Sequence, residues 1–227
     1  MQYTHLLFDA DDTLFDFQKG AVRAFEIMCH TCGIPHTPEN YRLYHEINKV
    51  LWAAFDRREV TKEFVTLERY VRFLKDLNLD LDPAQCNRIY LTALGEGVFP
   101  LPHAEEVCRT LAERGHRLYI VTNGVASVQK SRLQRCSFGP LFHALFISEE
   151  AGTSKPDKAY FEYVRTRLPE VTPDHTLVIG DSLTTDIQGA NNANLPCCWF
   201  NPKGLSAPKY LRIDHEIRDL RDLLNIV

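Results

Sequence analysis

Near its start the chain reads Leu6-Leu7-Phe8-Asp9-Ala10-Asp11-Asp12-Thr13-Leu14-Phe15. An apolar run long enough for a buried strand is followed at once by three carboxylates within four residues. Clustered negative charges repel one another, so a chain that keeps them together usually has a compensating cation. Because side chains alternate along a strand, Asp9 and Asp11 would point the same way at its carboxyl end. Two interpretations stay open at this point: a catalytic pair of carboxylates, or an acidic turn in which Asp12 and Thr13 cap a helix.

The composition of the chain is that of an ordinary globular protein. Its 227 residues are 44% hydrophobic and 25% charged, which is enough to bury a core as one large domain or as a domain with a smaller insertion. The formal net charge of -4 and the pI of about 6.1 argue against a nucleic-acid-binding surface. No apolar run approaches the ~18 residues of a membrane span, and the N-terminus lacks a signal-peptide pattern. We therefore expect a cytoplasmic monomer or homodimer that binds neither nucleic acid polymers nor membranes.

Seven cysteines in a chain without an export signal are typical of reduced thiols. Cys29 and Cys32 form one C-x-x-C pair, and His30 and His36 lie nearby in the sequence. A zinc site needs a second pair of ligands at comparable spacing, and none is evident. We therefore expect these cysteines to be small buried residues of a helix.

Residues 16–95 show helical periodicity throughout. Apolar residues recur at three- and four-residue spacing over residues 17–28, 41–55 and 61–77. The pair Asp82-Pro83 then opens a further helix, as an N-cap followed by proline at the first helical position. No strand pattern interrupts these residues, which predicts a wholly helical insertion.

From residue 96 onward, buried strands and helices alternate. Strands are predicted over residues 118–121, 145–148, 176–179 and 196–199, and helices over residues 104–114, 126–135, 158–168, 186–192 and 220–224. Nearly all-apolar strands separated by helices are typical of a parallel sheet covered on both faces. The predicted fold class is therefore α/β: a Rossmann-like, three-layer core of residues 1–15 and 96–227, with an inserted helical cap domain of residues 16–95.

Polar side chains stand at or just after the carboxyl ends of the predicted strands. Parallel strands bring these ends to one edge of the sheet, where ligands bind near the switch in strand order. Carboxylates at such an edge offer the hard oxygen ligands that Mg²⁺ takes. A lysine, a threonine hydroxyl and backbone amides would hold an anionic group beside them. Each residue alone could be an ordinary turn or cap residue, but the set predicts a shared site. The side chains are Asp9, Asp11, Thr122, Asn123, Lys155, Asp181 and Asp186.

Four motifs, in this order, resemble the signatures of the haloacid dehalogenase (HAD) superfamily of aspartyl-phosphate hydrolases. They are Asp9-x-Asp11-x-Thr13, Thr122 after an apolar strand, Lys155-Pro156, and Gly180-Asp181-x-x-x-x-Asp186. An insertion between the first and second motifs resembles the superfamily type that carries a helical C1 cap. More narrowly, residues 8–15, 48–52 and 147–152 resemble the YjjG-like group of pyrimidine nucleoside 5'-monophosphate phosphatases.

The resemblance implies a two-step hydrolysis of a small phosphorylated substrate. Asp9 would attack phosphorus and form an aspartyl-phosphate. Asp11 would protonate the leaving oxygen and then deprotonate the attacking water. Mg²⁺ would be held by Asp9, the Asp11 backbone carbonyl and Asp181, with Asp186 in support, and the phosphoryl oxygens would be bound by Thr122, the Asn123 amide and Lys155.

Other functions of the same signatures remain open. A phosphosugar phosphatase or mutase shares all four motifs and differs in what its cap does with the intermediate. A 2-haloacid dehalogenase of this fold needs neither Mg²⁺ nor a second acid, so Asp11 argues against it. A catalytically silent, phosphate-binding regulatory module would be expected to lack Asp9 or Asp11. Within the cap, Phe17, Tyr44 and Trp52 are candidates to contact a base or sugar.

Overall fold

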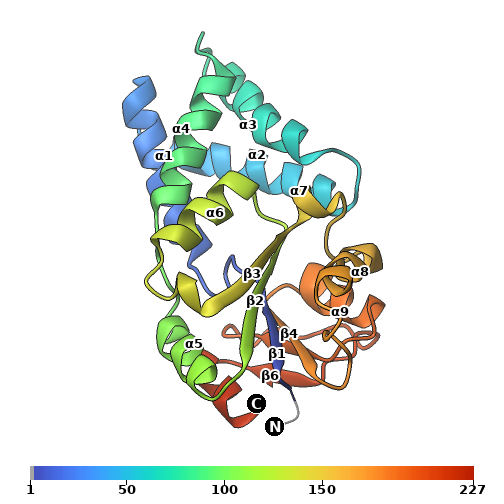
Figure 1. The fold of residues 1–227 in the computed structure, drawn as a ribbon. Helices are drawn as coiled ribbons and strands as arrows, with labels where there is room; N and C mark the ends of the chain where they lie inside the picture. Colours follow the sequence, from blue (N-terminus) through green and yellow to red (C-terminus); the bar gives the residue numbers. More distant parts are fainter. Residues whose placement is uncertain (1–2) are drawn as a thin grey trace. The chain divides into compact units, whose positions relative to one another are not determined.

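The computed structural model describes residues 3–227, which belong to two compact units (Figure 1). The first unit consists of Met1–Phe17 and Val98–Val227, and the second of Gln18–Gly97. We call them the core unit and the helical unit. Over residues 3–227, no helix combines the length and the apolar character needed to cross a membrane.

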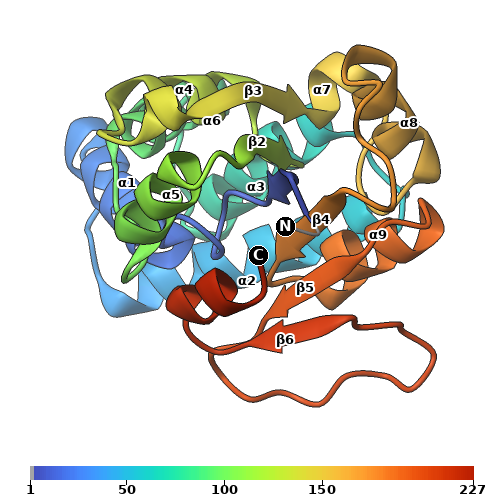
Figure 2. The ribbon, with the colours of Figure 1, turned by 60° about the horizontal axis from the view of Figure 1, so that its bottom comes forward.

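The core unit is built on a six-stranded parallel sheet, seen in Figure 2. Its strands are β1 (His5–Phe8), β2 (Arg117–Thr122), β3 (Phe142–Ile147), β4 (Thr176–Gly180), β5 (Cys197–Phe200) and β6 (His215–Ile217). Their order across the sheet is β3-β2-β1-β4-β5-β6, and every neighbouring pair is parallel. The predicted α/β fold class with a parallel sheet is confirmed.

Strand β6 was not predicted from the sequence, and the predicted elements differ from the structure at the end of β3 and at the helix after β4. Strand β6 has three residues, of which only the last is buried, so it carries no apolar run to find. The strand predicted over residues 145–148 ends at Ile147, and the short helix α7 (Ser148–Ala151) follows. The helix predicted over residues 186–192 begins earlier, as a π-helical turn over Leu183–Ile187 that leads into α9 (Gln188–Asn192).

Helices cover both faces of this sheet, as β1 illustrates. Leu6 and Phe8 pack in one apolar cluster with α5 (Ala104–Glu113) and the C-terminal 3-10 helix Leu220–Asn225. Leu7 packs in the other cluster, with α8 (Lys158–Arg167) and α9. All four residues of β1 are therefore buried, as expected for a central parallel strand covered on both faces.

Strand β1 also marks the point where the strand order reverses. It pairs with β2 on one side and with β4 on the other, so that Phe8 lies opposite both Ile120 and Ile179. The chain first builds β2 and β3 on one side of β1 and then continues with β4 on the other. Ligands of open parallel sheets bind at such a switch, beyond the carboxyl ends of the strands. The residues that follow β1, β2 and β4 occupy this position.

The helical unit contains four helices with well-defined starts. They are α1 (Phe17–Cys32), which begins at the end of the core unit, α2 (Pro38–Asp56), α3 (Lys62–Asp76) and α4 (Pro83–Glu96). The side chains of Thr37, Thr61 and Asp82 accept hydrogen bonds from the first turns of α2, α3 and α4. Such N-caps satisfy backbone N–H groups that have no partner inside the helix. The predicted cap at Asp82, followed by proline, is confirmed.

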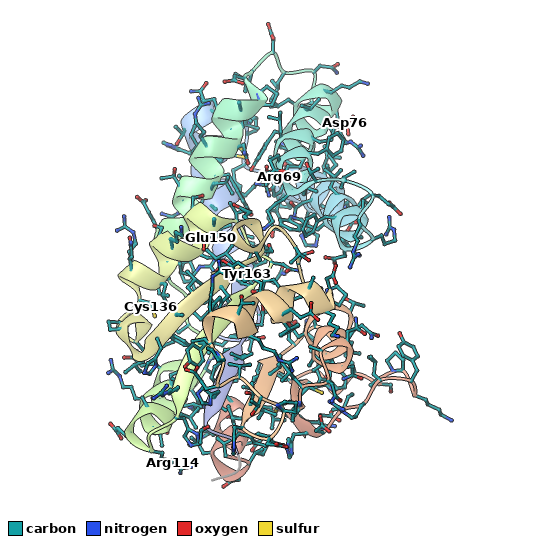
Figure 3. The ribbon with its side chains drawn as sticks, turned by 45° about the vertical axis from the view of Figure 1, so that its right-hand side comes forward. Arg69, Asp76, Arg114, Cys136, Glu150 and Tyr163 are labelled. Atoms are coloured by element: carbon teal, nitrogen blue, oxygen red, sulfur yellow. The ribbon has the colours of Figure 1, made fainter. Side chains whose placement is uncertain are left out.

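A buried arginine organises the core of the helical unit. The Arg69 guanidinium of α3 lies 4.7 Å from the centroid of the Tyr90 ring, a cation–π distance. It donates to the amide oxygens of Asn48 on α2, at 3.0 Å, and Asn87 on α4, at 2.9 Å. Arg69 thus ties three helices together from the space between them (Figure 3). Tyr44, which the sequence suggested as a substrate contact, is only 2% exposed in the same cluster, where it contributes to packing.

The C-x-x-C pair lies on α1 with its first thiol buried. Cys29 is fully buried, and Cys32 lies 3.6 Å from Cys86 of α4, sulfur to sulfur. Among the residues that the structure describes, no cysteine or histidine belongs to a group with metal-site spacing. The cysteines therefore pack between α1 and α4, in line with the expectation of small helix residues.

Tyr160 of α8 allows a test of how the strand ends are held. Its buried hydroxyl donates to the Phe146 carbonyl oxygen at 2.7 Å and accepts from the Thr122 N–H at 3.0 Å. Tyr160→Phe would leave both backbone groups buried without a partner. The free energy of unfolding, measured by urea denaturation, should therefore fall by about 1 to 3 kcal/mol.

Tyr163 on the same helix provides the matched control. Its side chain is half-buried, and within residues 3–227 its hydroxyl has no hydrogen-bond partner. Tyr163→Phe should change the free energy of unfolding by less than about 0.5 kcal/mol. Equal losses in the two variants would show that the Tyr160 hydroxyl does not hold the strand ends.

Candidate active site

The acidic stretch after β1 forms a turn that separates the roles of its carboxylates. Asp9 extends the strand, because its N–H donates to the Ile179 carbonyl oxygen at 2.8 Å. Asp12 has a φ of 59°, in the left-handed region that Asp tolerates better than most residues. Its carboxylate accepts from the N–H of Phe17, the first residue of α1, at 3.0 Å. Asp12 is therefore a structural residue of the turn, and Asp9 and Asp11 remain for the site.

Lys155 lies at the centre of the site, between two carboxylates. Its Nζ is 2.6 Å from Asp9 Oδ1, 2.6 Å from Asp186 Oδ1 and 2.8 Å from the carbonyl oxygen of Val121. These contacts use all three donors of the ammonium group. The side chains of Lys155 and Asp186 are 1% exposed, and that of Asp9 is 11% exposed. Ion pairs buried to this degree are screened little by solvent.

Three carboxylates meet around this lysine. Asp9, Asp181 and Asp186 each bring one oxygen within 4.8 Å of the others. Burial raises the pKa of Asp9 well above its ordinary value, although the cation of Lys155 opposes the shift. Burial and the charge of Asp186 raise the pKa of Asp181 to about 7. Burial disfavours the charged form of Lys155, but Asp186 and Asp9 outweigh it and keep the pKa of the lysine above its ordinary value. The site therefore holds more negative charge than its lysine neutralises.

This donor set fits a hard divalent cation. Carboxylate oxygens that converge without enough positive charge are the ligands that Mg²⁺ prefers. Burial is the main cause of the raised pKa values of Asp9 and Asp181, and the negative charge of neighbouring carboxylates adds to it. The predicted metal-binding residues Asp9, Asp181 and Asp186 are thus brought together, whereas the Asp11 carboxylate is not part of this group.

The chain positions Asp181 and Asp186 through a glycine and a threonine. A Cβ on Gly180 would overlap the carboxylate of Asp186, so only glycine leaves room for it. The Asp181 N–H donates to the Thr13 hydroxyl at 3.1 Å, and that hydroxyl donates to Asp181 Oδ1 at 3.3 Å. The Trp199 indole donates to the Asp181 carbonyl oxygen at 2.8 Å. Gly180 and Thr13 of the sequence motifs therefore have steric and hydrogen-bonding roles around the acids.

The predicted phosphate-binding residues lie beside Lys155. Asn123 bonds the Lys155 backbone twice: its Nδ2 donates to the carbonyl oxygen at 2.8 Å, and its Oδ1 accepts from the N–H at 3.0 Å. Its side chain therefore fixes the Lys155 loop against the end of β2. Thr122 Oγ1 accepts from the Gly124 N–H at 2.9 Å and can still donate its own proton to an anion.

Asp11 contacts two residues that the sequence did not single out. Arg132 Nη1 lies 2.5 Å from Asp11 Oδ1, and Gln129 Nε2 lies 2.6 Å from Asp11 Oδ2. Both belong to α6 (Ala126–Arg135), which follows the end of β2. Glutamine and arginine on a helix ordinarily face water, so their residue types gave no indication. The available signal was their three-residue spacing, which places both on one face of the first helix after β2.

Comparison with known proteins identifies the class to which this fold and site belong. Residues 3–194 match the haloacid dehalogenase-like hydrolase family. The chain belongs to this family, and the predicted hydrolase class and superfamily are confirmed.

The chain is similar over its whole length to individual members. It is 38% identical to the HAD-hydrolase YfnB of Bacillus subtilis, covering 100% of this chain and 96% of YfnB. It is 32% identical to the pyrimidine 5'-nucleotidase PynA of Streptococcus pneumoniae, over 99% of this chain and 95% of PynA. Identity to the pyrimidine 5'-nucleotidase YjjG of Escherichia coli is 30%, over 97% of this chain and 98% of YjjG. A crystal structure of YfnB bound to magnesium superimposes with a TM-score of 0.92 and covers 100% of this chain and 99% of that one.

Replacing Lys155 should show how much the buried charges depend on it. Lys155→Met would leave the carboxylates of Asp9 and Asp186 buried without their cation. The free energy of unfolding, measured by urea denaturation with a metal chelator present, should fall by about 3 to 5 kcal/mol.

The double variant Lys155→Met with Asp186→Asn provides the control. It removes one of the two carboxylates left without a cation, so its free energy of unfolding should fall by less than the sum of the losses in Lys155→Met and Asp186→Asn. A loss equal to that sum would contradict an ion pair between Lys155 and Asp186.

Proposed function

We propose that the chain is a Mg²⁺-dependent phosphomonoester hydrolase that works through an aspartyl-phosphate on Asp9. The observation that carries this proposal is the group at the sheet edge: Asp9 with Lys155 at 2.6 Å and two further carboxylates within 4.8 Å. A carboxylate and a phosphoryl group repel each other until cations neutralise them. Lys155 and a metal ion would provide that neutralisation at the attacking oxygen.

The residues that would hold Mg²⁺ differ in how free their oxygens are. Asp9 and Asp181 would be ligands, together with the Asp11 backbone carbonyl. Both oxygens of Asp186 already accept hydrogen bonds, one from Lys155 at 2.6 Å and one from the Ser182 N–H at 3.1 Å. Asp186 would therefore support the ion through water or by orienting its neighbours. When bound, Mg²⁺ would supply positive charge to the phosphoryl oxygens. The magnesium-bound YfnB crystal structure supports this choice of ion.

In the proposed reaction, the two acids of the first motif act in turn. Asp9 attacks phosphorus, and Asp11 donates a proton to the leaving oxygen. Asp11 then takes a proton from the water that hydrolyses the intermediate. The Thr122 hydroxyl and the Asn123 amide would bind the phosphoryl oxygens. Lys155, whose three donors hold Asp9, Asp186 and Val121, would contribute its positive charge beside them. A 2-haloacid dehalogenase would use neither the converging carboxylates nor Asp11, so these residues favour the phosphatase.

We propose a nucleoside 5'-monophosphate as the substrate, with a preference for pyrimidine or deoxypyrimidine bases. Support comes from PynA and YjjG, both named pyrimidine 5'-nucleotidases, which align over nearly the full length of both chains. The helical insertion, residues 16–95, would act as a cap that excludes water and selects the leaving group. The interdomain movement described for YfnB is consistent with such a role.

Asp9→Asn tests the nucleophile. Hydrolysis of p-nitrophenyl phosphate and of nucleotides should fall by at least about 10³-fold, because an amide does not attack phosphorus. Circular dichroism would show whether the variant remains folded. A chelator should abolish wild-type activity, and added Mg²⁺ should restore it. Mg²⁺-dependent turnover that persists in Asp9→Asn would exclude Asp9 as the nucleophile.

A substrate panel tests the narrower proposal. We expect kcat/KM for dUMP, dTMP and UMP to exceed that for purine nucleotides by about 10-fold or more, the discrimination that one binding pocket provides. Sugar phosphates should be hydrolysed less efficiently than the pyrimidine nucleotides. A preference for sugar phosphates over every nucleotide would overturn the nucleotidase proposal and leave the phosphatase proposal standing.

A further inference from the structure

We infer that Gln129 and Arg132 of α6 are positioning residues for Asp11, which set the orientation from which its carboxyl group meets the leaving oxygen. The inference rests on the proposed function of Asp11 as acid and base. It adds a part of the core unit, the helix after β2, to the machinery of that step.

The contacts engage both oxygens of the carboxylate. Arg132 Nη1 donates to Oδ1 at 2.5 Å, and Gln129 Nε2 donates to Oδ2 at 2.6 Å. One donor on each oxygen fixes the plane of the group as well as its location. Because the donors are three residues apart on one helix, they face Asp11 together. A single contact would leave the carboxylate free to rotate.

Arg132 is itself held firmly in place. Its side chain is only 3% exposed, and its guanidinium lies 5.2 Å from the centroid of the Phe15 ring. A buried guanidinium costs free energy unless a carboxylate pairs with it. Its carboxylate partner, Asp11, has a side chain that is 26% exposed. Arg132 is therefore a fixed, buried cation that orients the partly exposed carboxylate of Asp11. In an exposed ion pair, by contrast, both side chains are free to move.

A glycine provides the space for this contact. A Cβ on Gly124 would overlap the Gln129 amide and would lie 3.1 Å from Asp11 Oδ2. The φ of Gly124 lies outside the left-handed region, so space and not backbone conformation accounts for glycine there. Gly124 directly follows Thr122 and Asn123, the proposed phosphate-binding residues. The same segment that would bind the phosphoryl group therefore admits Gln129 to the acid beside it.

The chemistry makes this orientation measurable. A general acid acts only within hydrogen-bond reach of the oxygen that it protonates, and a misplacement of about 1 Å can cost about 10²-fold in rate. An alkyl oxygen, such as the 5'-oxygen of a nucleotide, needs this proton as its bond to phosphorus breaks. The p-nitrophenolate ion leaves without one. In the proposed mechanism kcat/KM reports only the steps through transfer of the phosphoryl group to Asp9, so later hydrolysis does not obscure the comparison.

The experiment compares kcat/KM for dTMP and for p-nitrophenyl phosphate in Gln129→Met, Arg132→Met and Arg132→Lys. If the enzyme hydrolyses another alkyl phosphate of the substrate panel more efficiently than dTMP, that compound replaces dTMP. In the two Met variants, kcat/KM for the alkyl phosphate should fall by about 10²-fold, while that for p-nitrophenyl phosphate changes by less than about 2-fold. Arg132→Lys keeps a cation and should recover part of the loss. Gly124→Ala, which displaces Gln129 without removing a polar group, should reproduce the Gln129→Met result.

Lys130→Gln is the matched control. Lys130 is a cation of the same helix that pairs with Glu150 of α7 at 2.5 Å, and within residues 3–227 it makes no hydrogen bond or ion pair with Asp11. Its substitution should leave both substrates unaffected. Circular dichroism of every variant checks folding, and if Arg132→Met does not fold, Gln129→Met and Gly124→Ala carry the same comparison.

The outcomes separate this inference from the proposed function. An equal loss of kcat/KM for both substrates would mean that the α6 residues only support the fold. An unchanged kcat/KM for both would mean that Asp11 does not need the α6 residues to take its orientation. Either result overturns the inference. Asp11→Asn is measured in parallel. If it leaves kcat/KM for the alkyl phosphate unchanged, the acid role of Asp11 fails, and the inference fails with it. If Asp11→Asn discriminates between the substrates and the α6 variants do not, only the inference fails.

Discussion

The buried ammonium group of Lys155 is the contact on which the rest of the site depends. It joins Asp9 after β1, Asp186 after β4 and the carbonyl oxygen of Val121 in β2. Taking these charges out of water is costly, and their mutual contacts offset that cost only while all partners are present. The Lys155 backbone is in turn bonded twice to Asn123. One residue therefore connects the segments of β1, β2 and β4 that meet at the sheet edge.

The same contact leaves the site short of positive charge. Three carboxylate groups lie together around this lysine, and burial, together with their mutual repulsion, raises the pKa values of Asp9 and Asp181. A protein selected for stability alone would have little reason to keep such a group. Its retention makes sense if a metal ion completes the neutralisation and an anionic substrate then finds balanced charge. The electrostatic strain is thus an argument for the proposed chemistry, independent of any relative.

Most of this site could be predicted from the sequence, because parallel strands determine which residues lie close together. Residues after consecutive buried strands meet at one edge whatever the details of the helices, so Asp9, Lys155 and Asp181 could be grouped without a structure. Strand β6, with three residues, could not be predicted, because it is defined by its pairing with β5 and its own sequence carries no strand pattern. Arg132 was missed for a related reason: its burial depends on packing around α6, and a helical arginine ordinarily faces water.

Two acids separated by one residue can differ in function only if their surroundings differ, and here they do. Asp9 is nearly enclosed, with Lys155 and two further carboxylates as neighbours. Asp11 is more exposed, and its oxygens contact a guanidinium and an amide of α6. Between them the backbone leaves the strand and enters the turn held by Asp12, so the second acid no longer shares the environment of the first. Contrasting environments of this kind allow one carboxylate to attack while its neighbour exchanges protons. In the proposed mechanism, the turn that ends β1 therefore allows two residues of one type to take two chemical roles.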